Sequence, residues 1–258
     1  MNRLNYQQQT GFTLIEMAIV LVIIGVLVGS FIGTLGSRID TTRRAEAQAD
    51  LENIKTALMG FAFSSGGPFL PCPCTSDCDI DPDTPPAPPG LENREADGTC
   101  TADAAAGYLG YLPWGTLGIK PADSWNSVYR YWVDPDFSDD GTGAGSVFDL
   151  ADTGNGQIRT RNPDGSATPL VASNVVAVVF THGKNAYGGI SAADGSARPA
   201  IPAVNVDETD NADTNSEFVG RAPTGAAAAT PGGEFDDILL WITDYEIKAR
   251  MVQVGMLP

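Results

Sequence analysis

An uncharged apolar run from Met17 to Gly36 constrains this chain more than any other feature. As an α-helix the run would measure about 30 Å, which is the thickness of a bilayer core. Glu16 comes directly before it and places one carboxylate at the start of the apolar helix. Because an ionisable group inside a membrane helix costs free energy, it marks a functional site and needs a partner. The sequence therefore predicts a membrane helix whose first turn carries a functional acid.

A secretory signal peptide is the other reading of this apolar run. Arg3 would then supply the basic region, and the small residues between Gly33 and Ser37 the cleavage site. However, the run is longer than the roughly 7 to 15 residues of a signal peptide core, and no A-x-A pattern ends it. We therefore do not expect cleavage after the run.

The residues before the run resemble a known family. A polar segment ends in Gly11, Phe12 follows, and Glu16 is the fifth residue after the glycine. In this order the segment resembles the leaders of type IV prepilins and of type II secretion pseudopilins. The resemblance implies that residues 1–11 are a leader, cut between Gly11 and Phe12 by a prepilin peptidase, and that Phe12 is then N-methylated.

The resemblance also implies a partner for Glu16. In a filament the new N-terminal amine of Phe12 in one chain would pair with the Glu16 carboxylate of a neighbouring chain. Removing one member of a buried ion pair costs roughly 3 to 5 kcal/mol, so this contact would direct assembly. The alternative is that Glu16 lies at the membrane interface and extends to the lipid headgroups.

Four glycines of the apolar run share one helix face at spacings of four, four and three. A face of small residues lets another helix backbone approach closely, which predicts helix packing. The alternative is that glycine is simply frequent in membrane helices. Members of the family often have a proline where Gly33 stands, so local unwinding would rest on glycine here. The four are Gly25, Gly29, Gly33 and Gly36.

The helix is expected to continue beyond the membrane. Apolar residues repeat at spacings of three and four while charged residues take the other faces, which predicts an amphipathic helix. We therefore divide it into a transmembrane half, 12–36, and an amphipathic half, 37–65, stopped by Gly66-Gly67-Pro68. Two helices hinged near Gly36 are the alternative. The apolar stripe comprises Ala47, Leu51, Ile54, Leu58 and Phe61.

Residues 66–258 are predicted to form one exported, acidic, loop-rich globular domain. The chain has 32 acidic and 15 basic residues, a formal net charge of -17, 29 Gly and 18 Pro. A negative field of this size repels nucleic-acid phosphates, so we expect no nucleic-acid partner. The length after the helix is sufficient for a domain with its own core.

Four cysteines lie close together at the start of this domain. In an exported protein an even number of cysteines predicts disulfides, and a bond across one residue would be strained. Two sets remain, Cys72–Cys78 with Cys74–Cys100 or Cys72–Cys100 with Cys74–Cys78. Either set would hold the Pro-rich insertion 79–98. A zinc site is the alternative, although the spacing is not a usual zinc-binding pattern.

Short apolar runs after the insertion predict a small antiparallel sheet, and hence an α+β, pilin-like fold. The runs are 128–133, 174–181 and 238–243. Thr243 and Glu246 have the spacing of a capping box, so a short helix through Met251 is expected after the last strand. Trp114, in Leu112-Pro113-Trp114, and Trp125 are predicted to support the core and a turn.

No enzyme is predicted. His182 is the single histidine, and Thr181-His182-Gly183-Lys184-Asn185 has the composition of a turn. No hydrolase, zinc-protease or phosphate-binding motif occurs. Calcium is the one cofactor that the acidic loops suit, with Asp207, Asp210 and Asp213 as candidate ligands. Solvated acidic loops are the alternative.

These features predict a single-pass protein of the bacterial inner membrane with a periplasmic domain, which becomes a structural subunit of a type IV pilus or a type II secretion pseudopilus. Its orientation is implied by the family resemblance. Its expected partners are the prepilin peptidase, other pilin or pseudopilin subunits and, before assembly, inner membrane lipid. A minor tip pilin acting as adhesin or assembly initiator is one alternative. A monomeric, membrane-anchored periplasmic binding protein is the other.

Overall fold

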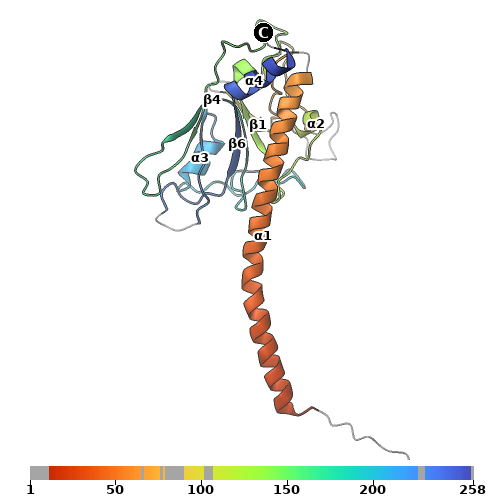
Figure 1. Ribbon diagram of the computed structural model, residues 1–258, viewed down its shortest axis with the longest axis vertical. Coiled ribbons are helices and arrows are strands. Elements are labelled where there is room, and N and C mark those ends of the chain that lie inside the picture. The colour runs from red at the N-terminus through yellow and green to blue at the C-terminus, as the bar shows by residue number, and fades with distance from the viewer. Residues whose placement is uncertain are drawn as a thin grey trace, which may run out of the picture. The chain divides into compact units, whose positions relative to one another are not determined.

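A computed structural model describes most of the chain (Figure 1). It covers residues 12–64, 67–75, 78, 90–101, 107–225 and 230–256, without the side chains of 30–37. The predicted leader, 1–11, and most of the predicted insertion, 79–98, lie outside the described residues. The chain divides into two compact units, Met1–Arg43 and Arg44–Pro258, which are described separately below.

A single α-helix, α1, spans Leu14–Ser64. It covers both predicted halves without a break near Gly36, so the alternative of two separate helices is wrong. It ends just before the Gly66-Gly67-Pro68 segment that was expected to stop it. Among the helices formed by the described residues, none has the length and apolar character needed to cross a membrane. The transmembrane half stays a prediction.

The second unit contains a six-stranded sheet with the order β1-β2-β4-β3-β5, and β6 pairs with β4 outside this path. The strands are β1 Tyr108–Tyr111, β2 Arg130–Val133, β3 Gly156–Arg159, β4 Leu170–Thr181, β5 Glu217–Val219 and β6 Ile238–Thr243. The short helices are α2 Trp114–Leu117, the 3-10 helix η1 Pro135–Phe137, α3 Val206–Ala212 and α4 Asp244–Val254.

The sheet is mixed, which corrects the prediction of an antiparallel sheet. β4 pairs antiparallel with β2, β3 and β6, but β3 and β5 run parallel. Between β4 and β5 the chain passes through α3, and this connection lets β5 run in the same direction as β3. The Asn211 side chain of α3 fixes β5, because its amide donates to the Val219 carbonyl and its oxygen accepts from the Val219 N–H.

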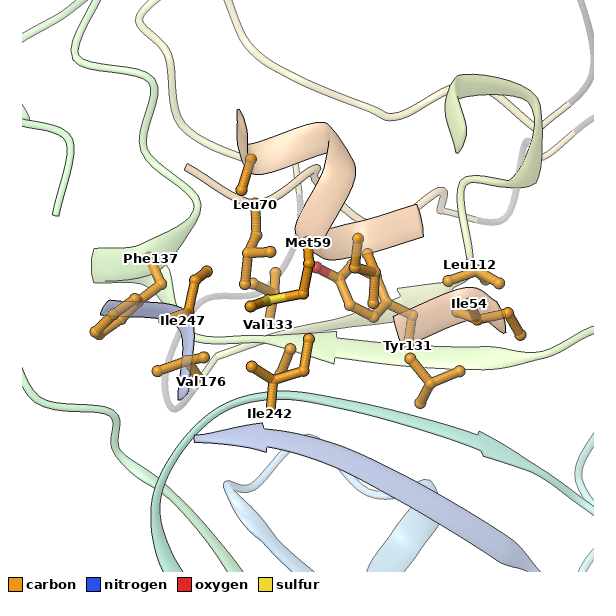
Figure 2. Packing of buried hydrophobic residues seen from close by; sticks show 14 of the residues in the cluster. Ile54, Met59, Leu70, Leu112, Tyr131, Val133, Phe137, Val176, Ile242 and Ile247 are labelled. Atoms are coloured by element: carbon orange, nitrogen blue, oxygen red, sulfur yellow. The ribbon is translucent and has the colours of Figure 1, made fainter. Parts of the chain in front are cut away.

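One face of the sheet packs against the C-terminal part of α1, residues 44–64 (Figure 1). The predicted stripe residues Ala47, Leu51, Ile54 and Leu58 are buried. The fifth, Phe61, is half-buried and meets Phe69 edge-to-face. Figure 2 shows Ile54 and Met59 of α1 packed among side chains of the strands and of α4, including Tyr131, Val133, Val176, Ile242 and Ile247.

Polar contacts add to this packing between α1 and the sheet. Asp50 accepts a hydrogen bond from the Tyr129 hydroxyl at 3.3 Å and pairs with Lys120 at 2.5 Å. Lys55 pairs with Glu246 of α4 at 2.7 Å. Residues 44–64 of α1 are therefore held by the burial of the apolar stripe, as predicted, and also by ion pairs.

A second apolar cluster covers the opposite face of the sheet. It contains Trp132, Ile158, Val175, Val178, Phe180 and Phe218. Because β4 is buried on both faces, its sequence is an almost continuous apolar run instead of an alternating one. This apolar run is the reason that the sequence predicts a strand at 174–181, although β4 starts earlier, at Leu170.

The predicted strand 238–243 matches β6, and 128–133 contains β2. The helix predicted after the last strand is α4, which begins at Asp244. Its N-cap Thr243 makes no side-chain capping hydrogen bond, so the predicted capping box is wrong. Instead, the Asp244 carboxylate accepts from the Tyr245 N–H at 2.7 Å.

Candidate functional site

The N-terminus of α1 is closed by a reciprocal contact between Thr13 and Glu16. The Thr13 backbone N–H and its hydroxyl both donate to Oε2 of Glu16 at 2.8 Å, and the Glu16 N–H donates to Thr13 Oγ1 at 3.3 Å. This arrangement is a capping box, which satisfies donors that a helix start leaves open. In the single chain Glu16 therefore stabilises its own helix. Sequence reasoning missed Thr13, although the T-x-x-E spacing is the signal that would have found it.

Apolar side chains around this cap are open to solvent. Phe12 is 83% exposed and Leu14 is 93% exposed. The following apolar residues are exposed as well: Ile15, Met17, Ile19, Val20, Leu21, Val22, Ile23, Ile24, Val26, Leu27 and Val28. A continuous apolar surface of this kind marks a region that binds another protein or a lipid phase.

Gly25 and Gly29 leave open space on the surface of α1. A Cβ atom added at either position would meet no atom within 4 Å. Another helix backbone would find no steric obstacle at these two positions. Gly33 and Gly36 lie in the segment whose side chains are not described, and Gly11 lies outside the described residues.

All four cysteines are paired, as Cys72–Cys100 and Cys74–Cys78. This is one of the two predicted sets, and no free thiol remains for a zinc site. The first bond joins the segment after α1 to the segment before β1. Glu92 strengthens the connection, because its carboxylate accepts from the Cys72 N–H at 2.8 Å.

Trp114 and Trp125 have the predicted structural roles. Trp114 is buried in a small cluster with Cys74, Cys78 and Val128. Trp125 lies in a turn, where its backbone N–H donates to the Asp123 carboxylate at 2.8 Å.

Asp207, the first calcium candidate, is fully buried and forms ion pairs with two arginines. Arg161 contacts one carboxylate oxygen at 2.5 Å, and Arg221 contacts the other at 2.6 Å. Asp210 and Asp213 are half-buried. Burial, followed by the charge of Asp213, raises the pKa of Asp210. Calcium at these residues stays a prediction.

The described acids that lie close enough to share an ion are Glu208, Asp236 and Asp237. Sequence reasoning did not select them, although Asp236-Asp237 directly before β6 was a visible signal.

His182 lies in a turn after β4, as predicted, and the Ala186 N–H donates to its carbonyl at 3.2 Å. Burial, followed by the charge of Arg130, lowers the pKa of His182 to about 3. An imidazole with this pKa is neutral at physiological pH and is a weak general base.

Comparison with known proteins identifies the N-terminal segment. The family model of the prokaryotic N-terminal methylation motif matches residues 6–32. The match contains Gly11, Phe12, the Thr13–Glu16 cap and the first turns of α1. Neither a curated protein nor a solved structure matches the chain. Residues 6–32 are therefore a prepilin-type cleavage and methylation segment.

Proposed function

We propose that this protein is a structural subunit of a type IV pilus or a type II secretion pseudopilus. The observation that carries the proposal is the methylation motif at 6–32, which leads directly into α1. A prepilin peptidase would cut between Gly11 and Phe12, and Phe12 would be N-methylated. The protein is not an enzyme in this proposal, and its function is mechanical.

Before assembly, the apolar N-terminal half of α1 would lie in the inner membrane, and the sheet unit would lie in the periplasm. The exposed apolar side chains between Phe12 and Val28 support a lipid or protein environment for this segment. The two disulfides support an oxidising compartment for the sheet unit.

During assembly, Glu16 would exchange one partner for another. In the single chain its carboxylate accepts two hydrogen bonds from Thr13. In a filament the N-terminal amine of Phe12 from a neighbouring chain would approach the same carboxylate and neutralise it. Gly25 and Gly29 support close packing, because nothing on the helix surface fills the space beside them.

The packing of α1 residues 44–64 on the sheet supports force transmission within the sheet unit. Leu51, Ile54 and Leu58 are buried in the core, and Asp50 and Lys55 form ion pairs with the surrounding elements. A pull on this part of the helix is therefore resisted by the whole core.

Glu16→Gln tests the proposal. The variant keeps the size of the side chain and removes its charge, so we expect normal cleavage after Gly11 and loss of filament incorporation. Glu52→Gln, an exposed position on the same helix, is the matched control and should assemble normally. Normal incorporation of the Glu16 variant would contradict the proposed role of Glu16. Absence of the wild-type chain from any filament fraction would favour the membrane-anchored monomer.

A minor tip subunit is the second candidate. The observation that favours it is the size of the sheet unit, whose segment from Cys72 to Cys100 is closed by a disulfide. A tip subunit would be present at about one copy per filament, whereas a structural subunit would be present throughout. Quantitative immunogold labelling of isolated filaments separates the two roles.

A further inference from the structure

Three buried carboxylates converge between α3 and the start of β6. They belong to Glu208, Asp236 and Asp237, and one oxygen from each lies within 4.8 Å of the others. Like charges this close repel one another strongly where water is excluded. The group therefore needs a compensating positive charge or bound protons.

The hydrogen bonds recorded for this acidic group come from neutral amides. Glu208 accepts from the side-chain amides of Asn185 at 2.8 Å and Asn205 at 2.9 Å. Asp237 accepts from the Asn211 side-chain amide at 2.8 Å through Oδ2. These donors orient the carboxylates without neutralising them, as the outer partners of metal ligands do.

Asp236 completes the pattern. Its Oδ2 accepts from the Asn185 backbone N–H at 2.9 Å. Its Oδ1, like Oδ1 of Asp237, is buried and has no hydrogen-bond partner among the described residues. A buried polar atom without a partner costs free energy, so two such atoms in one place point to a bound ligand.

His182 supplies an independent observation. Its side chain is 1% exposed, and neither ring nitrogen has a hydrogen-bond partner among the described residues. Nδ1 lies 3.9 Å from Oδ1 of Asp237, which is the unpartnered oxygen of that carboxylate. This gap is too long for a hydrogen bond. Two buried polar atoms therefore lie close together without a hydrogen bond between them.

We propose that Glu208, Asp236 and Asp237 bind a divalent cation, and that this cation is calcium. Calcium prefers carboxylate oxygens at about 2.3 to 2.6 Å, so two oxygens on opposite sides of the ion lie about 5 Å apart. Oxygens within 4.8 Å of one another fit around one such ion. His182 lies beside the ion, where its ring can bond to the ion's water.

The neighbouring acid Asp207 does not belong to this site. Arg161 and Arg221 already contact both of its oxygens, so its charge is compensated. The site therefore differs from the candidates Asp207, Asp210 and Asp213. It takes Glu208 from α3 and the two residues directly before β6.

A pocket borders one member of the acidic group. Asp237 lines a pocket of about 490 Å³ together with Arg44, Arg221 and Trp241. Asp237 is thus buried within the fold while its surroundings remain accessible from the surface.

Thermal unfolding of the full-length chain in detergent tests the site. The protein is first stripped with EDTA and then titrated with calcium. For the roughly 10⁻⁴ M dissociation constant of exported calcium sites, about 1 mM calcium should raise the folded-to-unfolded ratio about tenfold. No shift of the melting temperature in the wild type would overturn the proposal. A shift with manganese or zinc but none with calcium would overturn the assignment to calcium.

The stability of the Asp237→Asn variant relative to the wild type should change sign between EDTA and calcium. In EDTA the variant should be more stable than the wild type, because it removes one carboxyl group from a crowded, buried acidic group. In calcium it should be less stable, because it has lost a ligand. Asp210→Asn, on the same helix as Glu208, is the matched control and should keep the full calcium shift. A calcium shift that persists in Asp237→Asn would overturn the proposal.

A measurement on the wild type alone covers the case in which the variants do not fold. Terbium bound at the site should luminesce when tryptophan is excited, because Trp241 lines the same pocket as Asp237. Calcium should displace one terbium ion per chain and remove this signal. Luminescence that calcium leaves unchanged would contradict the site.

Discussion

The Thr13 backbone N–H and hydroxyl both donate to one oxygen of the Glu16 carboxylate, each at 2.8 Å. The carboxylate that assembly would require is therefore already hydrogen-bonded within the single chain. Pairing with a neighbour's amine would have to compete with this cap, and the cap would keep Glu16 oriented until a partner arrives.

Thr13→Val should loosen the first turn of α1. The substitution removes the hydroxyl that contacts Glu16, and loss of an N-cap costs about 1 kcal/mol. Hydrogen exchange of the amides from Leu14 to Met17 should become faster in the detergent-solubilised protein. Thr42→Val is the control, because the Thr42 hydroxyl donates to the Arg38 carbonyl in mid-helix. Equal exchange rates in wild type and Thr13→Val would show that the cap contributes nothing.

Two substitutions two residues apart on α1 should have opposite effects on stability. Leu58 is 0% exposed in the core, so Leu58→Ala should lower the free energy of unfolding by about 2 to 5 kcal/mol. Gly60 is exposed, and a Cβ there meets no atom within 4 Å. Gly60→Ala should therefore raise that free energy by about 0.5 to 1 kcal/mol. Urea unfolding followed by circular dichroism measures both, and equal effects would contradict the assigned helix face.

The two disulfides should contribute unequally to stability. Cys72–Cys100 closes a separation of 28 residues and Cys74–Cys78 a separation of 4. In the chain-entropy description these loops correspond to about 3.6 and about 1.9 kcal/mol. We expect the double Cys→Ser variant of the longer loop to melt at the lower temperature. The reverse order would indicate that local contacts, such as Glu92 with the Cys72 N–H, outweigh chain entropy.

As the pH falls toward 4, the wild-type protein should gain stability relative to the Asp134→Asn variant. Burial raises the pKa of Asp134 despite hydrogen bonds from the Asn155 and Asp136 N–H groups. The folded state therefore binds this proton at a higher pH than the unfolded chain, and stability increases as the carboxyl becomes protonated. The slope of the difference between the two proteins is at most about 1.4 kcal/mol per pH unit.

Asp164→Asn is the control for the pH measurement. Hydrogen bonds from the Ser166 hydroxyl and N–H lower the pKa of the exposed Asp164. The stability that the Asp164 carboxylate contributes is therefore lost as the pH falls, which is the opposite of the change expected for Asp134. Chemical denaturation at several pH values gives both difference curves. Parallel curves for wild type and Asp134→Asn would contradict the raised pKa.

The sequence predicts those parts of the fold whose signals are local. The stripe through Ala47, Leu51 and Ile54 predicts the buried face of α1, because helical period and burial follow the same spacing. β4 and β6 are visible as apolar runs. β1, β3 and β5 are not predicted, because strands of three or four residues carry too few side chains to show a period. β2 is as short, but it is predicted because its apolar run begins earlier, at Val128.

The missed features depend on pairing between distant segments. The parallel alignment of β3 with β5 joins Ile158 to Phe218, and nothing near either residue specifies it. The acidic group likewise joins Glu208 to Asp236 and Asp237 through the fold. In contrast, the processing segment is contiguous, and its residues could be identified by order and spacing alone.

The most direct test of the central claim is the intact mass and N-terminal sequence of the protein purified from its native membrane under non-reducing conditions. We predict a chain that begins at N-methylated Phe12 and whose mass corresponds to four oxidised cysteines. A chain that begins at Met1, or beyond Ser37, would contradict prepilin-type processing and leave a membrane-anchored or secreted domain in its place.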